Sequence, residues 1–189
     1  MKCVMGEVRT RPVVYNLKVH ILLTKEGAEH LKNALKTVEA KFHNNFAVVR
    51  AEHTYIIFPE KGFVNITGIK GFSQLDNVIT QFCQVFNLVK EEVASEIIVD
   101  NVSAAGDFAR RVNLVLLQQT FNKQRREGEK TRFFSAHFDR NFFPGAACKT
   151  RGFGTLTVFT SGKYVIVGAK CMEHVERLFQ EMSAAISKL

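Results

Sequence analysis

The chain contains no tryptophan, and its four cysteines are too scattered to pair or to bind metal. Cys3, Cys83, Cys148 and Cys171 form no close pair, and neither they nor the six histidines have metal-ligand spacing. This pattern argues against a disulfide framework and a zinc site, and it favours a reducing compartment. We therefore expect no structural metal and no cofactor.

Long apolar runs are also missing. No stretch approaches the roughly 20 apolar residues that a membrane-spanning helix requires. Residues 2–11 alternate charged and apolar side chains, so the N-terminus lacks the apolar core of a signal peptide. These absences predict a soluble, intracellular protein.

Acidic residues are too few to balance the basic ones. The chain has 26 Lys and Arg against 18 Asp and Glu, a formal net charge of +8. Such a surplus attracts polyanions, either nucleic acid or an anionic membrane surface. Charge alone leaves nucleic-acid binding and a merely basic surface as equal alternatives.

Phenylalanine is abundant, with 17 residues, and several of them lie beside turns and basic residues rather than in obvious core positions.

An internal repeat organises the sequence. Residues 143–170 form a β-rich block with an exposed turn expected at Ser161-Gly162, and residues 58–70 are an imperfect copy of it. Three pairs of identical residues are each separated by 100 positions: Gly62 and Gly162, Gly68 and Gly168, Lys70 and Lys170. This period predicts a tandem duplication, with repeats at 1–92 and 93–189 that form one domain together.

The first half predicts a strand, a helix, several strands and a second helix. Strands are expected at 12–23, 46–50, 54–58 and 63–68, with a tight turn at 52–53. Thr24 can cap a helix, and Ser73 with Asp76 forms a capping-box pattern before another. The apolar positions of these helices have helical spacing: Ala28, Leu31, Leu35 and Val38, then Leu75, Val78, Ile79, Phe82 and Phe86.

The second half repeats this order. A strand is expected at 97–102, an apolar stretch at 112–121 takes the place of the first helix, and an amphipathic helix runs from Met172 to Ile186. The basic segment 122–132 is predicted to be a solvated loop. Four helices can cover only one face of an antiparallel sheet, so the other face would stay open and would suit a ligand.

Residues that recur in both halves are the candidates for that face. They are Asn16 and Asn101, Phe46 and Phe143, and Phe58 and Phe159. An Asn amide can meet the acceptors in the minor groove of A·T pairs, and a Phe at a strand end can wedge between base steps. Taken singly, each residue is more typical of a turn or a core position. Their duplication on a basic protein brings the two interpretations to equal weight.

Several motifs resemble the TATA-box-binding protein family over nearly the whole chain. In the second half these are residues 143–145 (FPG), 157–163 (TVFTSGK), 167–170 (VGAK) and 99–102 (VDNV). In the first half they are residues 45–50 (NFAVVR) and 67–70 (TGIK). The motifs of the second half are the more specific.

The resemblance implies an α+β fold, a pseudo-twofold saddle of about ten antiparallel strands with four helices on the convex face. It implies binding of double-stranded, A·T-rich DNA by the concave face, with the minor groove bent by intercalating Phe pairs. The wedges would be Phe46 with Phe58 and Phe143 with Phe159. Asn16 and Asn101 would form the central hydrogen bonds, Thr67, Val165 and Val167 would line the floor, and Lys163 would hold a phosphate.

The same resemblance implies a non-enzymatic factor of transcription initiation. Its partners would be initiation factors and the RNA polymerase machinery, and a homodimer could form through the concave face when DNA is absent. It would act in the nucleus, or at the site of transcription in an infected cell if the chain is viral. Residues 145–150 lack the glycine before Lys149 that a phosphate loop needs, and 152–154 lead into a strand, so neither motif indicates an enzyme.

Three departures from the family pattern lie in the first half. Phe46 and Phe58 are 12 positions apart whereas Phe143 and Phe159 are 16 apart, Asn65 replaces an apolar floor residue, and Phe63 replaces the basic residue that Lys163 supplies. They favour an alternative in which the fold is a protein-interaction module with weak or lost DNA binding that acts through its helices. Exposure of the four Phe side chains would favour DNA binding, and their burial would favour the alternative.

Overall fold

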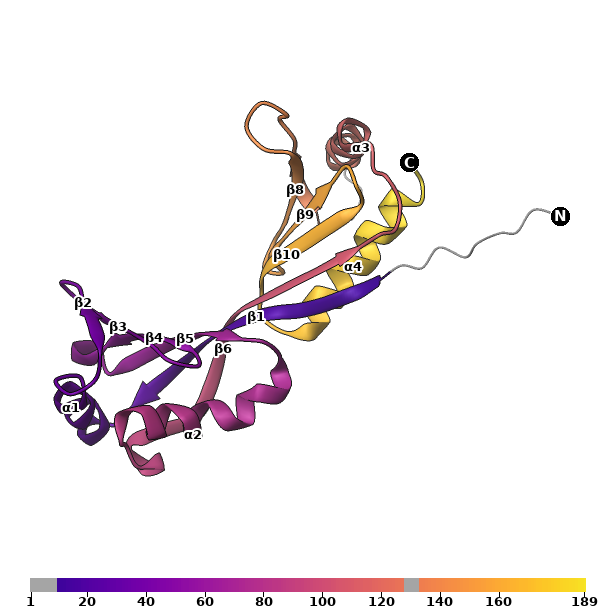
Figure 1. The fold of residues 1–189 in the computed structure, drawn as a ribbon. Helices are drawn as coiled ribbons and strands as arrows, with labels where there is room; N and C mark the ends of the chain where they lie inside the picture. Colours follow the sequence, from indigo (N-terminus) through magenta and orange to yellow (C-terminus); the bar gives the residue numbers. More distant parts are fainter. Residues whose placement is uncertain (1–9, 128–132) are drawn as a thin grey trace. The chain divides into compact units, whose positions relative to one another are not determined.

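The computed structural model describes residues 10–127 and 133–189, which form one antiparallel sheet and four α-helices (Figure 1). The strand order is β2-β3-β4-β5-β1-β6-β10-β9-β8-β7. The strands are β1 Thr10–Leu23, β2 Ala40–Phe42, β3 Ala47–Arg50, β4 Thr54–Phe58, β5 Phe63–Ile69, β6 Val93–Asp107, β7 Phe133–His137, β8 Gly145–Thr150, β9 Thr155–Phe159 and β10 Lys163–Ala169. The helices are α1 Lys25–Ala34, α2 Leu75–Phe86, α3 Leu114–Arg126 and α4 Met172–Ile186. The expected α+β class is confirmed.

The chain divides into two compact units. The N-terminal unit contains residues 15–101, and the C-terminal unit contains residues 102–189 together with 10–14. The predicted repeats, residues 1–92 and 93–189, describe the duplication of the sequence rather than these structural units. That boundary stays a prediction. Within the described ranges, no helix is both long and apolar enough to cross a membrane.

In the N-terminal unit, α1 and α2 pack on one face of the strands (Figure 1). Val64 and Ile66 in β5 are fully buried, and the residues that alternate with them are partly exposed. Tyr55 packs against α2, with its ring centroid 5.7 Å from that of Phe82 and 5.5 Å from that of Phe86. This burial raises the pKa of the Tyr55 hydroxyl to about 12.

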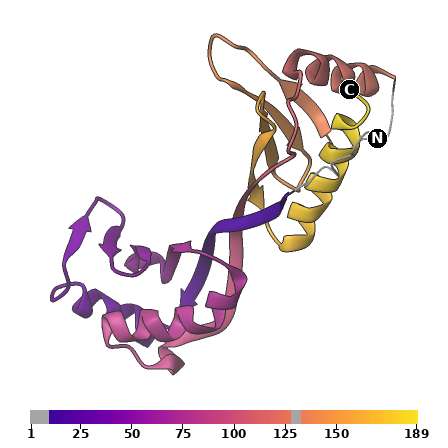
Figure 2. The ribbon, with the colours of Figure 1, turned by 45° about the vertical axis from the view of Figure 1, so that its right-hand side comes forward.

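In the C-terminal unit, α4 lies along the strands (Figure 2) and supplies Phe179 to an aromatic cluster. The ring centroids of Phe108 and Tyr164 are 4.5 Å apart, and Phe108 stacks on Phe179 at 5.6 Å. Phe121 of α3 packs on Phe133 of β7 at 5.1 Å. These contacts bury one face of the sheet, and the alternating residues of each strand face away from the helices.

The same backbone features recur 100 residues apart. Gly62 and Gly162 precede β5 and β10 with φ of 68° and 96°, and Gly68 and Gly168 have φ of 93° and 83°. β5 lies between β4 and β1, and β10 lies between β9 and β6. Positions 65 and 165 therefore occupy equivalent places in their units.

Two helix boundaries differ from the predictions. α1 is capped by the Thr24 side chain as expected, but it ends at Ala34, so Val38 lies outside it, and the unpredicted edge strand β2 follows. Ser73 lies in a 3₁₀ turn (Phe72–Gln74), and α2 begins at Leu75 without a side-chain cap. The Gln74 side chain accepts a hydrogen bond from the Lys70 amide instead. The predicted capping box is therefore wrong.

The C-terminal unit differs from the sequence predictions at three further places. α3 extends to Arg126, so residues 122–126 are helical rather than a loop, and the rest of the basic segment at 128–132 lies outside the described residues. Basic residues in the last turn of a helix favour its continuation, because they complement the helix dipole. Strand β7 was not predicted. Gly162, expected in an exposed turn, is buried against the backbone of Arg110.

Glu92 ties the start of α1 to the segment before β6. Its carboxylate accepts a hydrogen bond from the Val89 amide at 2.8 Å, and its Oε1 lies 2.9 Å from His30 Nδ1. Its backbone carbonyl accepts from the amide of Thr24, the α1 cap. The Val89 amide and, to a lesser extent, His30 lower the pKa of Glu92 below its ordinary value of 4.5.

Replacing Glu92 with Gln is expected to reduce the acid sensitivity of the N-terminal unit. A lowered carboxyl pKa stabilises the fold above the unfolded pKa, and this contribution is lost as the pH falls through about 4.5 and below. The free energy of unfolding should be measured with urea from neutral pH to about pH 3. Glu91→Gln, an exposed neighbour, is the control. Equal pH dependence in the two variants would contradict this assignment.

Candidate nucleic-acid interface

The face of each unit that points away from its helices is here called its open face. On the N-terminal unit its central strands are β1, β5 and β4, whose register aligns the partly exposed side chains across the sheet. The open face of the N-terminal unit contains Asn16, Lys18, His20, Phe46, Val48, Thr54, Ile56, Phe58, Phe63, Asn65 and Thr67. None of these side chains is buried.

The orientation of the Asn16 amide is fixed by the protein. Its Oδ1 accepts a hydrogen bond from the Gly68 amide at 2.9 Å and another from Thr67 Oγ1 at 3.2 Å. A backbone N–H can only donate, so the atom facing it must be the oxygen. The two N–H donors of Asn16 Nδ2 are therefore left for a ligand on the open face. Asn101 precedes Val102 in β6 as Asn16 precedes Leu17 in β1, and the strands pair equivalently there.

The two Phe predicted in the N-terminal unit lie together. The ring centroids of Phe46 and Phe58 are 5.5 Å apart, and both rings are half-buried. They belong to a longer aromatic row, which contains His43, Phe46, Phe58, Phe63 and His20 in spatial order. Adjacent centroids in the row are 4.5 to 5.5 Å apart. Sequence reasoning missed both histidines, although the alternation of His20 with buried β1 residues indicates its face.

The second Phe pair lies at equivalent strand ends of the C-terminal unit. The ring centroids of Phe143 and Phe159 are 5.9 Å apart, and Phe143 is 49% exposed. Gly145 lies beneath them, since a Cβ there would come 3.0 Å from a ring atom of each. Glycine therefore lets both rings lie close to the sheet. None of the four predicted wedge residues is buried, which is the outcome that favours DNA binding.

The predicted floor residues lie on the open faces. Val165 is half-buried and pairs with Thr157 and Ala105, and Val167 is 41% exposed. Register adds two residues that sequence reasoning missed. Ile56 lies opposite Asn65 in the N-terminal unit, as Thr157 lies opposite Val165 in the C-terminal unit.

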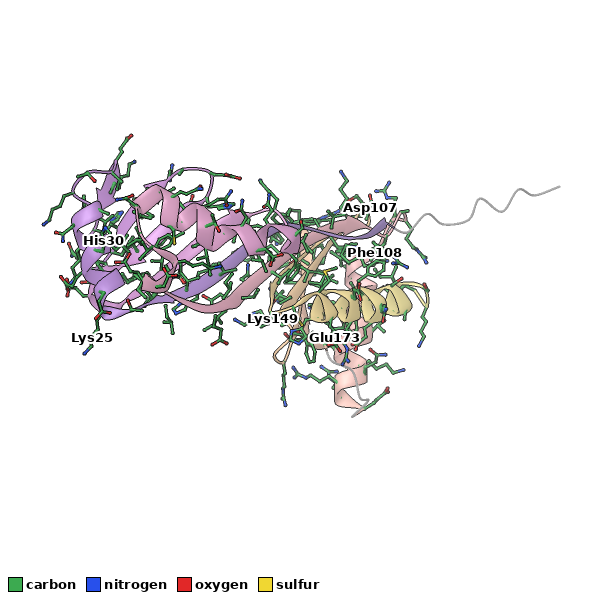
Figure 3. All side chains as sticks on the ribbon, turned by 90° about the horizontal axis from the view of Figure 1, so that it is seen from below. Lys25, His30, Asp107, Phe108, Lys149 and Glu173 are labelled. Atoms are coloured by element: carbon green, nitrogen blue, oxygen red, sulfur yellow. The ribbon has the colours of Figure 1, made fainter. Side chains whose placement is uncertain are left out.

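Basic side chains flank both faces. Lys163 is exposed at the start of β10, opposite Asp107, and Lys149 is exposed on β8 (Figure 3). In the N-terminal unit, Lys61 Nζ lies 5.7 Å from the Phe58 ring centroid, and Lys18 pairs with Asp100 at 3.2 Å. Ammonium groups beside an open face can contact phosphates without reading sequence. In the described part of the chain, no three His, Cys, Asp or Glu side chains are grouped to hold a metal ion.

Comparison with known proteins assigns this arrangement to a family. The family model described as "Transcription factor TFIID (or TATA-binding protein, TBP)" matches residues 96–189. The solved structure of Methanococcus jannaschii TBP is similar to the chain, with a TM-score of 0.74 and 19% identity over 95% of this chain and 100% of that one. At this identity the likeness shows the fold.

A heterotetrameric sarcosine oxidase from Corynebacterium sp. U-96, in complex with pyrrole 2-carboxylate, also matches. It has 12% identity over 94% of this chain and 83% of that one, and its TM-score of 0.30 is too low to support an argument. No curated protein sequence matches the chain.

Proposed function

This chain belongs to the TATA-binding protein family, and we propose that it binds and bends A·T-rich duplex DNA through the minor groove as a factor of transcription initiation. Family and fold support the coarser role, a DNA-binding transcription factor. The finer role follows from the residues on the open faces. The proposed role needs no nucleophile or general base, because DNA binding and bending break no bond and transfer no group.

The two Phe pairs are the observation that supports this proposal. Each pair lies on an open face, its rings are 5.5 or 5.9 Å apart, and none of the four side chains is buried. Exposed aromatic pairs at strand ends are costly unless a ligand covers them. Apolar side chains that enter between base steps of the minor groove unstack those steps and kink the duplex. In this proposal, Phe143 with Phe159 and Phe46 with Phe58 enter the duplex in this way.

The polar groups on the open faces fit the minor-groove edges of A·T pairs. Those edges present only acceptors, adenine N3 and thymine O2. Asn16 offers donors, because its oxygen is already bonded to Gly68 and Thr67. Asn101 takes the equivalent role at the start of the second half. Val165 and Val167 cover sugar and base edges without hydrogen bonds of their own.

Bending is unfavourable by itself. Smooth bending of a site by 40–90° costs on the order of 1–6 kcal/mol, and contacts along the bent groove must offset this cost. The +8 charge of the chain and Lys163 at the edge of an open face supply phosphate attraction. The wedges then select duplexes that kink easily.

The helix side is the proposed site for protein partners. In this proposal, initiation factors and the polymerase machinery bind there while DNA occupies the open faces, and the chain acts wherever the genome is transcribed. A homodimer through the open faces would compete with DNA.

A second candidate function uses the helix side alone, as a protein-interaction module with weak DNA binding. Exposed apolar residues on α3 favour it, since Val115 is 53% and Leu116 is 38% exposed. The exposure of the Phe pairs favours the DNA-binding function. In a module without DNA binding, no ligand would cover the half-exposed aromatic rings at the strand ends of either unit.

The deciding experiment measures binding and bending of an A·T-rich duplex by energy transfer between dyes on its two ends. A second duplex replaces A·T pairs by inosine·cytosine pairs, which keep the minor-groove acceptors and change the major groove. We expect equal bending of both duplexes. Bending lost on the inosine duplex would indicate major-groove reading, and binding without bending would leave only a basic protein that adheres to DNA.

Replacing Lys163 with Gln is expected to lower the salt dependence of DNA binding. One phosphate contact contributes about 0.9 to the slope of log K against log salt concentration, so the slope should fall by about that amount. Affinities should be measured over a salt series. Lys188→Gln, in an exposed position after α4, is the matched control. An unchanged slope in the Lys163 variant would remove this residue from the phosphate contacts.

A further inference from the structure

Asn65 is a polar residue in the middle of an open face, where the equivalent residue of the other unit is apolar. It pairs with Ile56 of β4 and with His20 of β1. Val165 holds the equivalent place, 100 positions later, and pairs with Thr157 and Ala105. The two halves of the binding surface therefore present different chemistry at one matched position.

The oxygen of this amide lacks a hydrogen-bond partner. Asn65 Oδ1 is buried, and no group in the described residues donates to it. The His20 ring on the opposite strand is stacked on Phe63, with centroids 4.7 Å apart. An unpaired buried acceptor is unfavourable, and such a group in a folded protein calls for an explanation. A ligand that supplies a donor at this place would remove the penalty.

Only one base edge in the minor groove can supply a donor. A·T and T·A pairs present acceptors alone, and G·C pairs add the N2 amino group of guanine. We propose that Asn65 reads one G·C base pair in the half-site bound by the N-terminal unit, through its oxygen and the guanine N2 amino group. This proposal rests on the proposed minor-groove binding.

The complete amide edge matches guanine. When Oδ1 accepts from guanine N2, the adjacent Nδ2 can donate to guanine N3, so that both ends of the side chain are bonded. A partial rotation about the Cβ–Cγ bond, short of a half-turn, brings the buried oxygen to the groove beside the nitrogen, so that both atoms face the guanine. An A·T pair at the same place meets Nδ2 but leaves the oxygen unpaired.

The preference is confined to one half of the site. Val165, Thr157 and Ala105 offer no comparable side-chain amide in the C-terminal unit. A duplex with a single G·C pair off its centre would therefore be bound in one orientation. Asn65 is in this sense a specificity-determining residue that also sets the direction of the protein on DNA.

The test moves a single G·C pair along an A·T-rich duplex, one base pair at a time and in both strand orientations. At each position, the affinity is compared with that for an inosine·cytosine pair, which lacks only the N2 amino group. For the wild-type chain we expect one position at which guanine is bound about five- to 100-fold more tightly than inosine. The Asn65→Val variant should bind the guanine and inosine duplexes equally there.

Val165→Asn is the matched gain-of-function control, and it should create a second guanine-preferring position in the other half. Bending of the all-A·T duplex, with no guanine preference at any position, would overturn this inference and leave the proposed function intact. A guanine preference that survives in Asn65→Val would also overturn it. No bending of any duplex would overturn the proposed function and the inference with it.

Discussion

Replacing both Phe143 and Phe159 with Ala is expected to abolish the bending of an A·T-rich duplex at the end bound by the C-terminal unit. The two rings are 5.9 Å apart, and Phe143 is 49% exposed. Each aromatic contact with a base contributes roughly 1–3 kcal/mol by substitution, so affinity should fall at least tenfold. Phosphate contacts would remain, and the residual binding should be strongly dependent on salt.

The measurement is energy transfer between the ends of the duplex, with the free energy of unfolding recorded beside it. Phe142→Ala is the matched control, because Phe142 is 87% exposed, adjacent in sequence and outside the pair. The double variant should lose bending and stay folded, whereas the control should keep both properties. Full bending by the folded double variant would show that this pair is not a wedge.

The equivalent change in the N-terminal unit, Phe46→Ala with Phe58→Ala, tests a pair whose rings make further aromatic contacts. These rings also stack on His43 and Phe63, at 4.5 Å in each case. Aromatic pairs contribute about 0.5–1.5 kcal/mol beyond the area they bury, so this variant should lose stability as well as bending. The bending of the two double variants should therefore be compared at conditions in which both are folded.

Replacing Gly162 with Ala is expected to destabilise the C-terminal unit by more than about 3 kcal/mol. The backbone of Gly162 has φ of 96°, and an added Cβ would lie 2.1 Å from the carbonyl oxygen of Arg110. A backbone atom cannot move aside as a flexible side chain can. The turn would have to open, and the Gly162 contacts with the segment after β6 would be lost, including the hydrogen bond from the Phe108 amide.

Gly152→Ala separates the two causes of that cost. Gly152 has φ of 82°, but an added Cβ would meet nothing within 4 Å. The free energy of unfolding of this variant should therefore fall only by the conformational cost of a side chain on left-handed backbone, about 1–2 kcal/mol. Urea unfolding of both variants and of the wild type gives the two values. Equal losses would mean that the close approach to Arg110 is relieved at little cost.

Local patterns in the sequence were sufficient to predict several of the strands and helices. Strands β1, β3, β4, β5, β9 and β10 and helix α4 follow alternation or helical spacing, which depend on neighbours a few residues away. The Thr24 cap is also a local feature and is confirmed. The glycines 100 residues apart indicated the repeat, because left-handed backbone positions demand glycine wherever they recur.

The short edge strands β2 and β7 had no such pattern. They are held by pairing with the next strands of the chain, β3 and β8. The capping box at Ser73 was wrong because Gln74 engages the Lys70 amide, and α3 continued beyond its apolar stretch with a basic last turn. The edge strands and the start of α2 depend on contacts that local preference does not include, and the end of α3 depends on basic residues that complement the helix dipole.

The sequence by itself determined which residues recur and which face of a strand each one takes. The tertiary structure decided what each of them meets across the sheet. Only strand register places Gly68 against Asn16, so that its oxygen is bound and its donors are free, and brings His20 and His43 to the ends of the aromatic row. The tertiary structure also distinguishes Asn65 from Asn16, because the Asn65 oxygen has no hydrogen-bond donor among the described residues. The physical reason is that cross-strand neighbours are far apart in sequence, so local periodicity contains no information about them.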